Sequence, residues 1–151
     1  MPYGISIRTN LTKRFQDRVV SALGSKELVG VYSAMELAAA RVVLRHYQRR
    51  GFGHGDVTGR TRRAATLVRG SAGRSTRIEW QEGKGAAPVG ILDLYGGKTR
   101  NFVPLRFTER MVKESAGRAS AAAAAAGRRS LTQRLGGVRR KLASMPMRRV
   151  R

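Results

Sequence analysis

The side chains that could perform acid–base, nucleophilic or metal chemistry are few and scattered in this chain. It has two histidines, His46 and His54, nine acidic residues and no cysteine. A zinc site needs three or four ligands from Cys, His and carboxylates, and neither histidine has a partner at metal-ligand spacing. Glu79 and Glu82 lie close in sequence, but we interpret them as solvated charges at a strand end. Without a Ser-His-Asp order or a P-loop motif, the sequence predicts a binding and assembly protein, not an enzyme, with no cofactor and no metal.

Positive charge, by contrast, is abundant. Lysine and arginine number 31 against nine acids, which gives a net charge of +22. A field of this size attracts polyanions over a Debye length of about 10 Å or less, so we expect nucleic acid or an acidic protein surface as a neighbour. The codon bias of a GC-rich genome would explain the preference for arginine over lysine, but not the shortage of acids. The chain shows no signal-peptide pattern and no run of about 18 apolar residues, so we expect no leader and no membrane span.

The basic residues are densest in residues 128–151, which hold nine of them and no acid. Leu131, Leu135, Val138 and Leu142 recur there at three- and four-residue steps, which is typical either of a short amphipathic segment or of a tail that orders on binding. Such a tail would gain from double-stranded DNA through counterion release, or would contact an acidic protein instead. Few aromatic residues interleave the charges, so base stacking is not expected. The candidate contact residues are Arg128, Arg129, Arg134, Arg139, Arg140, Lys141, Arg148, Arg149 and Arg151.

Two helices are expected in the first third of the chain. Asn10 is a plausible N-cap for a helix over residues 11–23, and Gly24 would end it. A longer helix is predicted over Lys26–Arg50, with a basic last turn before Gly51. Its apolar residues recur at helical spacing and should face a core. They are Leu28, Val31, Met35, Ala38, Ala39, Val42 and Tyr47 or His46.

Strands are expected around residues 5–7 and over residues 64–68, 75–81 and 89–95, joined by glycine-containing loops that favour antiparallel neighbours. In the third of these segments alternation puts Ile78 and Trp80 on one face and Arg77 and Glu79 on the other.

A last helix is predicted from near Pro104 to about Ala126, with Gly127 after it. Phe107, Met111, Val112, Ser115 and Ala119 can share one of its faces. The fold class is therefore α+β: a long helix packed on a small antiparallel sheet, with a C-terminal helix and a basic tail. Residues 1–127 form the predicted domain, which we expect to fold without residues 128–151.

Three short stretches are not explained by composition. In chain order they are Val57-Thr58-Gly59-Arg60-Thr61-Arg62-Arg63, Leu94-Tyr95-Gly96-Gly97-Lys98-Thr99 and Val103-Pro104-Leu105-Arg106-Phe107. Their order, with a long helix before them and a helix opening at the last, resembles tailed-bacteriophage proteins of the virion-morphogenesis or tail-completion family. These proteins lie at the neck, where head and tail join. The resemblance covers about residues 27 to 127, and the family's usual arginine-proline-phenylalanine is replaced here by Pro104 two residues before Arg106.

The resemblance implies a structural virion protein at the head–tail junction, assembled in the host cytoplasm. It also implies a homo-oligomeric ring, usually six-fold, around the DNA channel, in contact with other neck, connector and tail proteins. A cyclic ring uses heterologous interfaces, so two different faces of each subunit meet. The candidate interface residues are Arg60, Arg62, Arg63, Tyr95, Gly96, Gly97, Lys98, Arg106 and Phe107, although the first three could equally be a solvated cluster at a strand end.

The alternative function is a small basic nucleic-acid-binding protein of the ribosomal or nucleoid type. Composition supports this class equally well, but no RNA-recognition, KH or helix-turn-helix module is recognisable. Other virion roles, such as a minor capsid or terminator protein, also stay open.

Overall fold

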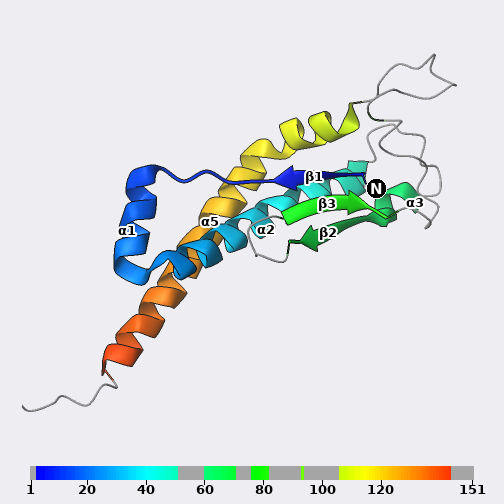
Figure 1. The fold of residues 1–151 in the computed structure, drawn as a ribbon. Coiled ribbons are helices and arrows are strands. Elements are labelled where there is room, and N and C mark those ends of the chain that lie inside the picture. Colours follow the sequence, from blue (N-terminus) through cyan, green and yellow to red (C-terminus); the bar gives the residue numbers. More distant parts are fainter. Residues whose placement is uncertain (1–2, 51–59, 71–75, 82–92, 94–105, 144–151) are drawn as a thin grey trace, which may run out of the picture.

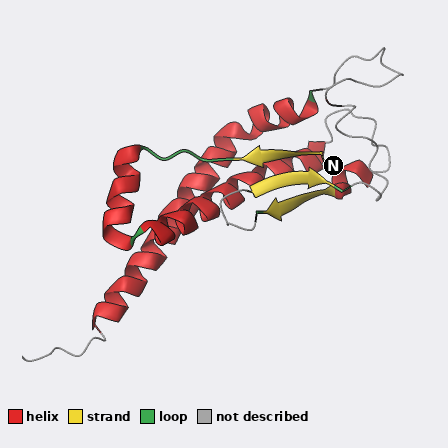
Figure 2. Ribbon diagram, viewed as in Figure 1, coloured by secondary structure: helices red, strands yellow, loops and turns green. Residues whose placement is uncertain are grey.

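The computed structural model describes residues 3–50, 60–70, 76–81, 93 and 106–143 of the chain (Figure 1). Within these residues the fold is α+β, as predicted. A small antiparallel sheet lies against a helix, and a second long helix crosses that helix (Figure 2).

The sheet has three strands, β1 (Tyr3–Ile7), β2 (Ala65–Arg69) and β3 (Thr76–Trp80), in the order β1-β3-β2. Both pairings are antiparallel, and Trp80 of the central strand stands opposite Tyr3 on one side and Ala65 on the other. Ile78 and Trp80 are buried and Arg77 is exposed, which confirms the alternation predicted for this strand. The strand expected around residues 5–7 is also confirmed.

The strand predicted over residues 89–95 is wrong at Asp93, the residue of that segment that the structure describes. Asp93 has a helical backbone and takes no part in the sheet. Within the described residues, the two neighbours of β3 in the sheet are β2 and the N-terminal strand β1. The apolar run misled the prediction because its single acid, Asp93, binds a helix terminus.

Helices α1 (Lys13–Leu23) and α2 (Ser25–Arg50) occupy the region where two helices were predicted. The N-cap of α1 is Thr12, not Asn10, and no side chain caps it. Gly24 ends α1 as expected: its φ of 91° suits glycine, and its N–H donates to the Val20 carbonyl at 2.8 Å. The predicted stripe of α2 faces the core, where Leu28, Val31, Met35, Ala39 and Tyr47 are buried.

Two helices differ from the expectation. Helix α3 (Arg60–Ala64) is a single turn directly before β2, where a loop and strand end were predicted. Helix α5 (Phe107–Ala143) passes through Gly127 without a break, so the predicted helix end near Ala126 is wrong. Glycine in a helix costs about 1 kcal/mol relative to alanine, but tertiary packing outweighs that cost here. Gly127 is buried against Met35, and Ser130 and Leu131 continue the contact with the rest of the molecule.

The core lies between α2, α5 and the inner face of the sheet. Trp80, Tyr47 and Phe107 are fully buried, with ring centroids 5.4 to 5.8 Å apart. The indole N–H of Trp80 donates to the Tyr47 hydroxyl at 3.1 Å, so the buried indole N–H has a hydrogen-bond acceptor. This aromatic cluster holds the first turn of α5 on the sheet and α2.

Candidate functional site

The first turn of α5 is capped by Asp93, a residue that is only 1% exposed. Its Oδ1 accepts the backbone N–H of Thr108 at 3.1 Å, and its Oδ2 accepts the hydroxyl groups of Thr108 and Tyr3. The N–H of Arg106 donates to the Asp93 carbonyl at 3.0 Å. The first N–H groups of a helix lack intrahelical partners and carry partial positive charge, so a carboxylate there is stabilising. Sequence reasoning missed Asp93; the available signal was one acid inside an apolar run.

Tyr3 belongs to the same network through its 2.5 Å hydrogen bond to Asp93. Burial, and then this hydrogen bond, raise the pKa of the Tyr3 phenol to about 12. The phenol therefore stays protonated at neutral pH and donates to the carboxylate. A cap with a protonated phenol positions a helix; it does not supply a general base.

The described residues of the first and third sequence motifs lie at the starts of helices α3 and α5. Arg60 begins α3, the helix that directly precedes β2; within it Arg62 is half-buried and Arg63 is exposed. Arg106 is exposed at the start of α5 with a φ of 45°, and its carbonyl accepts the first helical N–H from Arg110. Phe107 is fully buried in the core, so we assign it to the core and remove it from the candidate interface. Tyr95, Gly96, Gly97 and Lys98 lie outside the described residues.

His46 links α2 to α5. Its Nε2 lies 3.2 Å from the Glu114 carboxylate, and its Nδ1 lies 2.9 Å from the Arg118 guanidinium. Because a guanidinium only donates, Nδ1 must accept, and the Nε2–H then donates to Glu114. This arrangement fits a neutral imidazole that ties two helices together. Among the described residues, no three His, Asp or Glu side chains are placed to hold a metal, and His54 lies outside them.

Four of the candidate DNA-contact arginines form one surface, which we call the α5 basic face: Arg128, Arg129, Arg139 and Arg140. All four are exposed. At 3.6 residues per turn they fall within a sector about 120° wide. Gly127 and Ser130, which are buried, lie on the opposite side of the helix. The side chain of Lys141 and all of Arg148, Arg149 and Arg151 lie outside the described residues.

Arg134 differs from these four because it faces α2. Its guanidinium forms an ion pair with Glu27, and its Nε donates to the Ser130 hydroxyl at 3.2 Å. Gly30 makes room for it, since a Cβ at that position would overlap the Arg134 guanidinium. The charge of Arg134 is thus paired with an acid of the same chain, and we remove Arg134 from the candidate DNA contacts.

A shallow groove of about 260 Å³ separates β1 from α5. Its walls include Ile7 of β1 and the small side chains of Ala116 and Ser120 on α5, and Ala39 and Val43 of α2 also line it. Ser6, Arg8 and Thr9 also line the groove, but most of its lining is apolar.

Comparison of the chain with protein-family models, curated proteins and solved structures found no match in any of the three. None of the helices within the described part of the chain combines the length and apolar character that crossing a membrane requires.

Proposed function

We propose that this protein is a structural virion component of a tailed phage, forming a ring at the head–tail junction, around the DNA channel, as tail-completion or neck proteins do. The observation that carries the proposal is the order of the three sequence motifs, of which the structure describes residues 60–63 and 106–107. Arg62 and Arg63 stand directly before β2, and Arg106 opens α5. Asp93 directly precedes the second motif in the sequence. It accepts the backbone N–H of Arg106, in the third motif, and the backbone N–H of Thr108, one residue after that motif.

Charge constrains how such a ring would assemble. Each subunit carries a net charge of +22, so identical subunits repel one another at low ionic strength. An anionic neighbour inside or beside the ring would relieve this repulsion. DNA in the channel or an acidic connector surface meets that requirement, and raised salt would partly replace it by screening.

The alternative function, a small basic nucleic-acid-binding protein, is favoured by the exposed α5 basic face. The two functions predict different particles. Negative-stain electron microscopy and mass photometry of the full chain, at about 0.15 and 0.5 M salt, distinguish them. Rings with a central hole support the neck function. A monomer at both salt concentrations that retards RNA or DNA in a gel supports the alternative.

A matched pair of variants tests whether the motif region forms the subunit interface. Arg106→Glu reverses one exposed charge at the third motif, and Arg45→Glu reverses one exposed charge on α2. We expect the first to abolish rings and the second to leave them intact. Equal ring populations in the two variants would contradict the interface assignment.

A further inference from the structure

We propose that the α5 basic face binds the phosphate backbone of double-stranded DNA without reading its sequence. The inference rests on the proposed function for the choice of DNA as the polyanion. It replaces the expectation of an independent basic tail with a helical surface in which four particular arginines act together.

The spacing of the charges suits a long, regular polyanion. The pairs Arg128–Arg129 and Arg139–Arg140 are 11 residues apart, or about 16 Å along the helix axis at 1.5 Å per residue. Thr132 and Gly136 lie between them on the same side. A hollow there is lined by Thr132, Leu135, Gly136 and Arg139, and the two small residues among them, Thr132 and Gly136, leave room for a phosphate backbone to approach the helix.

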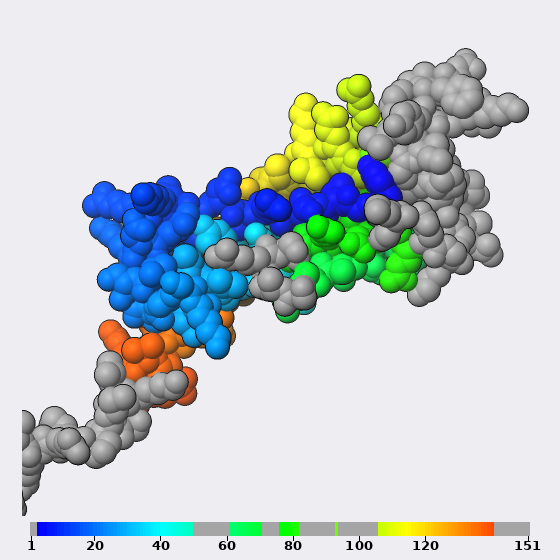
Figure 3. All heavy atoms as spheres, in the orientation of Figure 1, coloured from blue at the N-terminus to red at the C-terminus, as the bar shows by residue number. Residues whose placement is uncertain are grey.

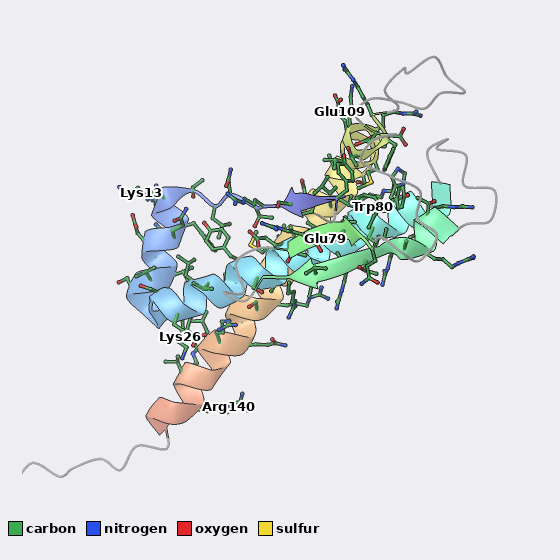
Figure 4. The ribbon with its side chains drawn as sticks, turned by 45° about the vertical axis from the view of Figure 1, so that its right-hand side comes forward. Lys13, Lys26, Glu79, Trp80, Glu109 and Arg140 are labelled. Atoms are coloured by element: carbon green, nitrogen blue, oxygen red, sulfur yellow. The ribbon has the colours of Figure 1, made fainter. Side chains whose placement is uncertain are left out.

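The helix is also exposed where these charges lie. The C-terminal part of α5 extends beyond α1, and its atoms project from the body of the molecule (Figures 1 and 3). Arg140 lies on this projecting end (Figure 4). A partner can therefore reach the α5 basic face without displacing another described element.

The charges of this face are not compensated within the described residues. No acidic residue follows Glu114 in the sequence. Arg134, on the opposite side of the helix, is the arginine that pairs with Glu27. The described contact of Arg140 is a 3.4 Å hydrogen bond to the Gly136 carbonyl, which leaves its charge available. Bound DNA would release counterions in proportion to the phosphates that these four guanidinium groups neutralise.

The chemistry of the face favours duplex phosphate over other polyanions. Residues 128–143 contain no aromatic side chain, so they offer no stacking platform for single-stranded bases. All four charges are guanidinium groups, whose planar fork matches phosphate oxygens. The Thr132 hydroxyl is already engaged with the Arg128 carbonyl at 3.1 Å. Phosphate contacts of this kind position a protein on DNA but do not select a sequence.

The test uses the full chain and two unrelated duplexes of about 30 base pairs, with affinity followed by fluorescence anisotropy from about 50 to 300 mM NaCl. The test variant carries Arg128→Gln, Arg129→Gln, Arg139→Gln and Arg140→Gln. The control variant carries Arg41→Gln, Arg45→Gln, Arg49→Gln and Arg77→Gln, which removes the same charge from four other exposed arginines. Arg134→Gln is a second control on the same helix.

We expect the wild type to bind both duplexes equally, with affinity falling steeply as salt rises. In the test variant the log–log salt slope should be shallower by about 3 to 4, at roughly 0.9 per phosphate, with affinity at about 0.1 M salt at least about tenfold lower. The control variant and Arg134→Gln should change the slope by less than about one. Removing either arginine pair alone should make the slope shallower by about 1 to 2. These two variants keep the test decisive if the fourfold variant folds poorly.

Equal slopes in the test and control variants would overturn the proposal, because net charge alone would then explain binding. A wild type that does not bind duplex at about 50 mM salt would also overturn it, and would point to an acidic protein partner. Ring formation is scored on the same samples by mass photometry. If rings form and the salt slope of the test variant equals that of the wild type, this inference alone would be overturned. Monomers whose slope depends on the α5 basic face would support it and overturn the neck function.

Discussion

Asp93 caps helix α5 by accepting the backbone N–H of Thr108 on its Oδ1 at 3.1 Å. The two residues are 15 positions apart, and the same carboxylate also accepts the Tyr3 hydroxyl from the other end of the chain. The buried side chain of Asp93 therefore joins the N-terminal strand β1 to the start of α5. This junction fixes where α5 begins and how it leaves the sheet.

We expect Asp93→Ala to destabilise the protein by about 2 to 4 kcal/mol. The variant loses a helix cap and leaves three partly buried donors, on Tyr3 and Thr108, without their acceptor. Chemical denaturation monitored by circular dichroism measures the change. Asp17→Ala is the control, because Asp17 is exposed on α1, and its effect should stay within about 0.5 kcal/mol. A loss no larger than that of the control would rule out a capping role for Asp93.

Stability should fall between about pH 10 and pH 12 because of Tyr3. The phenol of an unfolded chain loses its proton near the ordinary pKa of 10.0, whereas in the folded chain the pKa is raised to about 12. Over this range the folded state holds more protons than the unfolded state, so raising the pH favours unfolding. Tyr3→Phe removes this contribution. The thermal midpoint of the variant should fall less than that of the wild type over the same pH range, and parallel curves would contradict the assignment.

Gly127→Leu should destabilise the protein by about 1 to 3 kcal/mol. Gly127 is buried where α5 meets α2, and even a Cβ would stand 3.0 Å from Met35 Sδ, so a larger side chain must push the helices apart. Gly117→Leu is the matched control on the same helix, since nothing lies within 4 Å of its Cβ position. That control should gain up to about 1 kcal/mol through helix propensity. Thermal midpoints that shift in the same direction would show that the helix contact is misplaced.

A chain that ends at Gly127 should be less stable than one that ends at Arg140, by about 1 to 3 kcal/mol. The shorter chain loses buried Ser130, the contact of Leu131 with the core and the ion pair of Arg134 with Glu27. This outcome is opposite to the sequence expectation that residues 1–127 fold independently of residues 128–151. Equal denaturation midpoints for the two chains would instead support the expectation that residues 1–127 fold independently.

The local elements were largely predictable because burial leaves a period in the sequence. The three- and four-residue steps of Val31, Met35 and Ala39 marked the buried side of α2, and the alternation of Ile78 and Trp80 marked the buried side of β3. These signals depend only on the geometry of a helix or a strand. They failed at Asp93 and at Gly127, where contacts distant in sequence decide the structure.

The charge, the α+β class, the places of the main helices and strands, and the concentration of arginine near the C-terminus were all determined by the sequence alone. Which arginines face outward was decided only by the tertiary structure. Arg134 and the other arginines of α5 carry the same side chain. Helical spacing places Arg134 on another side of the helix, but it does not tell which side faces α2. The crossing of α5 over α2 turns Arg134 toward Glu27, 107 positions away, and leaves Arg129 and Arg140 in solvent. The direction in which one helix packs on another depends on side chains from both, and for that reason the four-arginine face is defined only by the two helices together.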